Sequence, residues 1–182
     1  IDALAVIVNP ANPVDQLTID QLADIFTGRI TNWQDVGGND APIILVSRES
    51  NSGTHVYFLE EVVRKGDSDN TDIFAAKTLM MPSSVGITSE VGRNPNAIGY
   101  DGLGYVTSEV KLVGISSLEE PDFYVLPSAA SVADSTYLIS RNLYMYTPDV
   151  PTGVVKEYID WILSPEAQEI VSELGFVPIL DQ

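Results

Sequence analysis

The hydrophobic positions along the chain alternate between strand-like runs and helical spacing. Residues 3–8 and 43–46 form short continuous apolar runs rich in β-branched side chains, which is typical of buried strands. Residues 137–146 form a longer strand-like stretch. Between these runs, apolar residues recur three and four positions apart, and this spacing predicts amphipathic helices.

The predicted helices carry recognisable start and stop signals. Thr18 with Gln21 forms a capping-box pair, and Gly28 is placed to end the helix that follows. A second helix begins near Thr54, with Val56, Leu59 and Val63 on one face. Two helices are predicted near the end of the chain, where Ser164 precedes a proline that opens the second and Gly175 closes it.

The middle of the chain is less regular. Residues 83–93 predict a short helix, and residues 97–100, 103–106 and 112–115 predict short strands. Strands that alternate with helices predict an α/β fold. The 182 residues, 45% of them hydrophobic, suffice for one good core, or for one lobe and part of another.

The net charge of −17, from 9 basic and 26 acidic residues, limits the partners of the chain. It disfavours nucleic acid and anionic membranes, which bind through Lys and Arg clusters, so no nucleic-acid partner is expected. The acidity fits solubility or adaptation to a salty medium, with an acidic face for a basic partner as the alternative. The absence of cysteine excludes disulfides, thiol catalysis and cysteine-ligated zinc. The acidic residues lack metal-ligand spacing, so no metal or other cofactor is expected.

The candidate chemistry lies in residues 47–54, between a predicted strand and a predicted helix. A helix N-terminus offers unpaired backbone N–H groups and a positive dipole end to an anion. Gly53 permits close approach of a ligand, Ser52 and Thr54 add hydroxyl donors, and Arg48 supplies a planar fork for two oxygens. The pattern favours a small tetrahedral oxyanion, held at short range against the negative field of the chain.

Each of these residues also has a structural interpretation. Ser52 can be an ordinary N-cap, and Arg48 can be a surface residue paired with Glu49. Spacing alone leaves both interpretations open. His55 is interpreted as a bystander because nothing near it completes a catalytic triad, and Trp33 and Trp161 as core or lobe-packing residues.

Several blocks of the chain resemble one protein family in the right order. The most specific are residues 25–33 with 36–38, and the Arg48-x-x-x-Ser52-Gly53-Thr54 pattern. Residues 9–14, 97–100 and 140–146 extend the likeness over nearly the whole chain. The chain thereby resembles the periplasmic phosphate-binding proteins that serve ABC transporters.

This resemblance implies a fold and a site. Arg48, Ser52, Gly53 and Thr54 would contact bound phosphate. The fold would be a periplasmic-binding-protein-like (type II) α/β lobe with two hinge-crossing strands. Residues 1–8 would be one hinge strand, residues 9–136 the second lobe with the anion loop, and residues 137–182 the returning hinge strand and the C-terminal helices of the first lobe.

The resemblance also implies a function. The chain would bind inorganic phosphate between lobes, outside the cytoplasm, and deliver it to the membrane components of an ABC transporter, with no enzymatic step. The family's N-terminal third has no counterpart here, and neither does a signal segment, so we expect a processed or truncated chain with an incomplete first lobe. The terminal helices would then need a separate N-terminal fragment, a second copy or local repacking to cover them.

Three alternatives remain open. The ligand could be another tetrahedral oxyanion, tungstate or molybdate, whose binders use a similar Arg and Ser-Gly-Thr-His stretch. An enzyme acting on phosphoryl groups would need a nucleophile with its base, or metal ions, beside the loop, and the sequence offers neither. A truncated interaction or signalling module would use the exposed face of the terminal helices.

Overall fold

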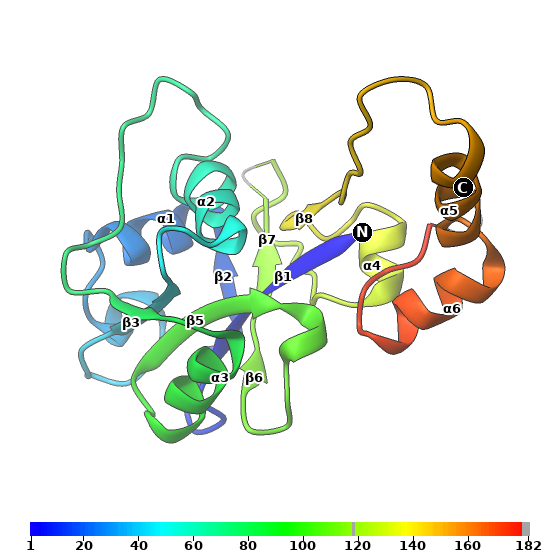
Figure 1. The fold of residues 1–182 in the computed structure, drawn as a ribbon. Helices are drawn as coiled ribbons and strands as arrows, with labels where there is room; N and C mark the ends of the chain where they lie inside the picture. Colours follow the sequence, from blue (N-terminus) through cyan, green and yellow to red (C-terminus); the bar gives the residue numbers. More distant parts are fainter. Residues whose placement is uncertain (118, 180–182) are drawn as a thin grey trace.

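The computed structural model describes residues 1–117 and 119–179. Its main element is a six-stranded mixed sheet in the order β4-β3-β5-β1-β6, with β8 also paired to β1 (Figure 1). Strands β3, β4 and β5 run parallel to one another, whereas β1 runs antiparallel to its neighbours. The strands are β1 (Asp2–Val8), β3 (Ile44–Arg48), β4 (Leu79–Met81), β5 (Ala97–Gly102), β6 (Lys111–Leu112) and β8 (Ser140–Arg141).

Strand β1 is buried along its whole length, on both faces of the sheet. Leu4 and Val6 join the larger hydrophobic core, and Ala5 and Ile7 join a smaller core on the opposite face. Burial on both faces explains why the sequence of β1 is continuously apolar rather than alternating. The predicted buried strand at residues 3–8 is confirmed.

Helices cover both faces of this sheet. Those beside it are α1 (Ile19–Thr27), α2 (Gly53–Phe58) and α3 (Ser84–Arg93). Phe26 of α1 and Phe58 of α2 lie in the larger core, and Ile87 of α3 lies in the smaller one. A small parallel sheet pairs β2 (Gln16–Thr18) with β7 (Gly114–Ser116). The predicted α/β fold is confirmed.

The capping signals of α1 act as the sequence predicts. The Thr18 hydroxyl accepts from the Gln21 backbone N–H at 3.1 Å, and the Gln21 side chain accepts from the Thr18 N–H at 2.9 Å. Gly28 ends the helix in the left-handed conformation, with φ of 81°. Both ends of α1 are therefore set by neighbouring residues in the sequence.

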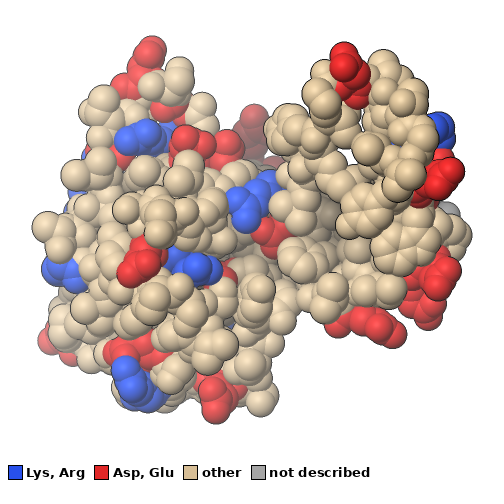
Figure 2. Space-filling model, in the orientation of Figure 1, with Lys and Arg blue, Asp and Glu red and all other residues tan. Residues whose placement is uncertain are grey.

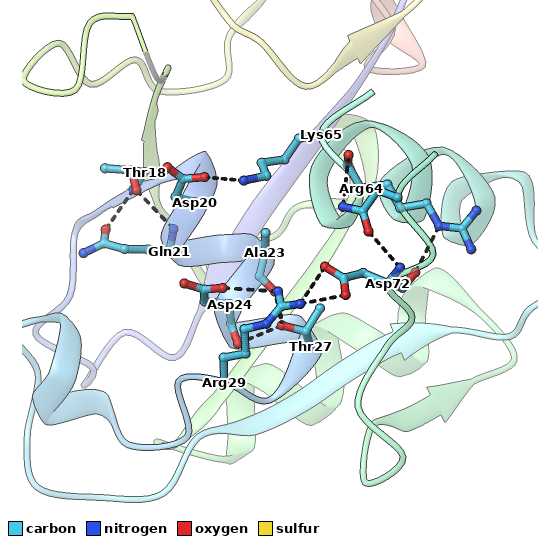
Figure 3. Close-up of polar contacts among 11 residues, drawn as sticks. Thr18, Asp20, Gln21, Ala23, Asp24, Thr27, Arg29, Arg64, Lys65 and Asp72 are labelled. Atoms are coloured by element: carbon cyan, nitrogen blue, oxygen red, sulfur yellow. Dashed lines mark hydrogen bonds and ion pairs between the residues drawn. The ribbon is translucent and has the colours of Figure 1, made fainter. Parts of the chain in front are cut away.

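Ion pairs join α1 to the segment that follows α2 (Figure 3). Nη2 of Arg29 donates to both carboxylate oxygens of Asp72, at 2.6 and 2.8 Å, and Lys65 pairs with Asp20 at 2.7 Å. The hydrogen bonds from Arg29 hold the pKa of Asp72 below its ordinary value. Because these pairs are exposed, each adds little stability and serves mainly to fix the position of the segment that contains Lys65 and Asp72.

The C-terminal part lies beside the sheet domain, in yellow to red in Figure 1. It contains α4 (Ala129–Ala133), α5 (Gly153–Ile162) and α6 (Pro165–Glu173). Backbone hydrogen bonds attach it to β1: Leu4 N–H donates to the Ile139 carbonyl at 2.9 Å, and Val177 N–H donates to the Ile1 carbonyl at 2.9 Å. No residue of α5 is buried in the structure as described: on its apolar face Val155 and Tyr158 are exposed, and Ile159 and Ile162 are half-buried.

Two strand predictions were wrong, one in its extent and one in its type of structure. The long strand predicted for residues 137–146 is confined to β8, because Arg141 already lies opposite Asp2, the first residue of β1. Residues beyond it have no strand alongside within the described chain, and Tyr146 is 90% exposed. The strand predicted at 103–106 is instead a 3₁₀ turn, Leu103–Tyr105, which brings Gly104 against the backbone of Gly175.

The helix predicted after Thr54 exists, but its buried face differs from the prediction. His55, Phe58, Val62 and Val63 are its buried residues, and Val56 is exposed. The helix widens into a π-helical turn at Leu59–Val63. A π turn has more residues per turn than an α-helix, so it shifts the side chains beyond it around the axis.

Substituting Gly28 should be more damaging than substituting Gly37. Both glycines have positive φ, at 81° and 84°, so an alanine at either is strained by about 1 kcal/mol. At Gly28 the added Cβ would also lie 3.1 Å from the Ala75 Cβ, whereas at Gly37 it would meet no atom within 4 Å. Chemical denaturation of Gly28→Ala and Gly37→Ala should show the larger loss of unfolding free energy for the first. Equal losses would contradict this account of the α1 C-terminus.

Candidate anion-binding site

The candidate site lies where three parallel strands end. Arg48 is the last residue of β3 and pairs with Met81, the last residue of β4. The register between β3 and β5, in which Leu45 faces Ile98, places Asp101 level with Arg48. In open α/β sheets, ligands bind outside this carboxyl edge of the strands.

Ser52, Gly53 and Thr54 form the N-terminal turn of α2. Ser52 is the N-cap, in an extended conformation, and its hydroxyl oxygen accepts from the Thr54 N–H at 3.3 Å. Gly53 is exposed, and Ser52 and Thr54 are half-buried. The N-cap interpretation of Ser52 is therefore correct, and it leaves the hydroxyl hydrogen available to a ligand.

Arg48 is half-buried and bonds away from α2, toward the start of α3. Its Nη1 donates to the Ser84 hydroxyl at 3.2 Å, and its Nη2 donates to the Pro82 carbonyl at 3.4 Å. None of the ion pairs among the described residues includes Arg48, so the suggested pairing with Glu49 is not formed. The guanidinium thus keeps its positive charge uncompensated by direct contact with a carboxylate.

A buried carboxylate, that of Asp101, accepts a hydrogen bond from Ser84. The Asp101 Oδ1 accepts from the Ser84 hydroxyl at 2.9 Å and from the Gly102 N–H at 2.8 Å, and the residue is 1% exposed. Burial raises the pKa of Asp101 above its ordinary value, although these two hydrogen bonds oppose the shift. Sequence reasoning missed Ser84 and Asp101. The signal in the sequence was an acidic residue near the end of an otherwise uncharged strand.

His55 holds the backbone at the start of the loop from the buried side. Its Nδ1 lies 3.0 Å from the Arg48 carbonyl oxygen and 3.2 Å from the Ser47 hydroxyl, which in turn lies 2.6 Å from the Tyr100 hydroxyl. Burial lowers the pKa of His55, which favours the neutral ring. The residue fixes the backbone of the loop, a role that its interpretation as a bystander overlooked.

The two tryptophans differ. Trp33 is 1% exposed, and its Nε1 donates to the Asn96 carbonyl at 2.9 Å, so it is a core residue as predicted. Trp161 is 47% exposed and packs near Tyr158 on α5, with ring centroids 6.4 Å apart. It is therefore not part of the core of the described chain.

A second guanidinium reaches the loop from β8. Nη1 of Arg141 donates to the Gly53 carbonyl at 2.9 Å, and its Nε and Nη2 donate to Asp2 Oδ2 at 3.1 and 2.8 Å. Its guanidinium carbon lies 5.2 Å from the centroid of the Tyr57 ring. These contacts fasten the first turn of α2 to β1 and β8. Arg141 could not be singled out from the sequence, because an arginine in a strand carries no local sign of its partner.

The site offers oriented donors within a strongly acidic molecule. Acidic groups are scattered over the face in Figure 2, and basic groups are few. An anion would therefore be attracted only by groups that contact it, since the long-range field of the −17 chain opposes binding. The described residues contain no group of three or more His, Asp or Glu side chains that could hold a metal ion. None of the described helices is long and apolar enough to cross a membrane.

Comparison with known proteins identifies the class. The family model described as a PBP superfamily domain matches residues 1–166. The chain therefore belongs to the PBP superfamily, and the fold expected from the resemblance is confirmed.

The relatives narrow the likeness to phosphate-binding proteins. The phosphate-binding protein PstS of Pseudomonas aeruginosa is 33% identical over 98% of this chain, and that of Bacillus subtilis is 32% identical over 98%. The chain spans 58% and 55% of the length of these curated relatives.

Solved structures agree. A putative phosphate ABC transporter substrate-binding protein from Clostridium perfringens, with bound phosphate, is 36% identical with a TM-score of 0.80; the match covers 98% of this chain and 69% of that one. An ABC-type phosphate transport receptor from Vibrio cholerae is 33% identical, with a TM-score of 0.79; the match covers 97% of this chain and 69% of that one.

The stability of the chain should fall on mild acidification through His55. The folded pKa of His55 is below the ordinary value of 6.5, so the unfolded chain binds the proton more readily. The contribution of the neutral ring to stability is then fully present well above the ordinary pKa of 6.5 and is lost as the pH falls through the lowered folded pKa. Denaturant titrations across this range should show a steeper decline for the wild type than for His55→Gln, which lacks the titrating group. Parallel curves for the two proteins would contradict the role of a neutral His55.

Proposed function

We propose that this chain contributes the anion loop of a phosphate-binding protein, with Arg48, Ser52, Gly53 and Thr54 contacting the phosphate. The observation that carries the proposal is the Arg48 guanidinium, free of carboxylate contact, at the same sheet edge as the first turn of α2. A planar guanidinium binds two phosphate oxygens well, and a helix N-terminus adds backbone donors. Relatives over 98% of the chain carry the phosphate-binding name.

We further propose a role in transport rather than catalysis. The solved relatives are an ABC-type phosphate transport receptor and a putative phosphate ABC transporter substrate-binding protein, which supports delivery of phosphate to membrane components from outside the cytoplasm. The neighbouring His55 is 7% exposed and its ring packs on Phe74, with ring centroids 4.6 Å apart, which supports a packing role rather than that of a general base. A phosphate held here would be bound and released unchanged. No cofactor is needed for that role.

Loss of Arg48 should weaken phosphate binding by about 10- to 100-fold, because hydrogen bonds to a charged group contribute roughly 1.5–3 kcal/mol. Titration calorimetry on wild type and Arg48→Ala would measure the effect. Arg93→Ala is the matched control, since it removes an exposed arginine that pairs with Glu90. Equal affinities in wild type and Arg48→Ala would refute the proposed site.

Competition on the same preparation would identify the anion. Phosphate should displace labelled phosphate at lower concentration than molybdate or tungstate. If molybdate or tungstate competes better, the loop belongs to a binder of those oxyanions, which is the open alternative.

An apolar groove in the C-terminal part indicates a missing contact. Its volume is about 650 Å³, and its walls include Leu143, Met145, Ile159 and Val171. None of the side chains that line the groove is charged, and Val154 and Tyr158 on α5, one of the helices that form it, are 79% and 60% exposed. Contiguous exposed apolar surface of this kind marks an interaction site. We propose that a further protein segment, absent from this chain and corresponding to the unmatched part of the relatives, covers it.

The chain alone should therefore self-associate through this surface. Light scattering should detect oligomers that Val154→Lys with Tyr158→Lys disperses, because a lysine cannot be buried there without cost. Val85→Lys is the control, because Val85 is an equally exposed valine (72%) on α3. A strictly monomeric chain, or equal dispersal by Val85→Lys, would count against the assigned surface.

A further inference from the structure

Two buried atoms without partners lie in one chain of contacts. In the described residues, Nε of Arg48 and Oδ2 of Asp101 are buried and make no hydrogen bond, and Ser116 Oγ is the third such atom. Orphaned buried polar atoms are rare in folded proteins and call for an explanation beyond stability. Arg48 and Asp101 are connected through a single side chain, that of Ser84.

Each hydrogen bond of this connection has a fixed donor and a fixed acceptor. An ionised carboxylate can only accept hydrogen bonds, so the Ser84 hydroxyl must give its hydrogen to Asp101 Oδ1, 2.9 Å away. Its lone pairs are then left for Nη1 of Arg48, at 3.2 Å. Asp101 therefore sets the orientation of the Ser84 hydroxyl, and the hydroxyl in turn receives the guanidinium.

The backbone supports the same arrangement. Asp101 is the penultimate residue of β5, Ser84 begins α3 shortly after β4, and Arg48 ends β3, so each lies on a different strand or helix at the same sheet edge. Ser84 and Asp101 are 8% and 1% exposed, which keeps water from replacing either partner. The second bond of the fork, to the Pro82 carbonyl at 3.4 Å, is long by comparison with an ordinary hydrogen bond. Ser84 is thus the stronger of the two contacts that hold the guanidinium.

We propose that Ser84, oriented by the buried Asp101 carboxylate, is a positioning residue that holds the Arg48 guanidinium ready for an anion at the loop. This inference rests on the proposed function and adds two residues to it. An arginine that is already ordered loses less side-chain entropy when the ligand binds, so affinity rises without a new ligand contact. Neither Ser84 nor Asp101 needs to touch the anion.

The neighbouring serine provides a matched control. Ser83 is the N-cap of α3, where its hydroxyl accepts from the Gly86 N–H at 3.2 Å, whereas the hydrogen bonds of the Arg48 side chain go to Ser84 and Pro82. Ser83→Ala should destabilise α3 without changing phosphate affinity. Ser84→Ala should weaken phosphate binding by about three- to tenfold, and Ser84→Thr, which keeps the hydroxyl, should restore it.

The second readout is independent of phosphate. Nitrogen-15 NMR of the Arg48 side chain reports how fast the guanidinium rotates. Rotation should be slow in the wild type, Ser83→Ala and Ser84→Thr, and fast in Ser84→Ala. Asp101→Asn should also make the rotation of the Arg48 guanidinium faster. An amide can donate to the Ser84 oxygen, so the Ser84 hydroxyl is no longer held in one orientation. Unfolding midpoints measured in parallel identify any variant that has lost its fold.

The outcomes separate the two proposals. Unchanged Arg48 rotation in both Ser84→Ala and Asp101→Asn would overturn the positioning role, whatever the affinity for phosphate. Equal loss of affinity in Ser83→Ala and Ser84→Ala would also overturn it, because helix stability would then explain the effect. A wild-type chain that binds no phosphate, yet shows slow Arg48 rotation that Ser84→Ala abolishes, would refute the proposed function and leave Ser84 as the residue that orders Arg48.

Discussion

Burial of the central sheet on both faces is the constraint on which the candidate site depends. Because β1 and β5 are buried on both sides, helices must cover each face, and the polar groups of the candidate site gather at the edges where the strands end. The parallel strands β3, β4 and β5 end at one such edge. Arg48, Ser84 and Asp101 meet there although 53 positions separate the first from the last. The strand order determines this meeting, and no local pattern does.

The separation along the chain between interacting residues explains which features could be predicted from the sequence. The start and end of α1 depend on residues within a few positions of one another, so Thr18, Gln21 and Gly28 were sufficient to locate them. The loop from Arg48 to Thr54 is equally local, and its order of strand, loop and helix was predicted correctly. The extent of β8 depends on which residues of β1 remain opposite it, and this requires the register. The partners of Arg48 likewise come from distant strands, so they could not be predicted.

The electrostatics of the molecule favour short-range recognition. A chain of net charge −17 repels a small anion at distances beyond the Debye length of about 8 Å only weakly, and more strongly as the anion approaches. Donors fixed in advance offset this repulsion because they need no reorganisation when the anion arrives. The buried Asp101 adds negative charge near the site, and the raised pKa of its carboxyl reflects the cost of that burial. Its hydrogen bond to Ser84 indicates that orientation of Arg48, rather than a more positive potential, is the property that this arrangement provides.

Arg141 links the loop to the rest of the chain. Its contacts to Gly53 and Asp2 hold the first turn of α2 against the start of β1 and against β8, from which the chain leads to the C-terminal helices. A shift of the α2 N-terminus would therefore have to break a charge-assisted hydrogen bond or carry β8 with it. Because β8 pairs with β1 through only Ser140 and Arg141, the chain beyond it is held by few backbone contacts. The Arg141 guanidinium thus contacts the candidate anion loop and belongs to the strand that leads to the exposed apolar surface. A movement of either part would therefore be transmitted to the other through this side chain.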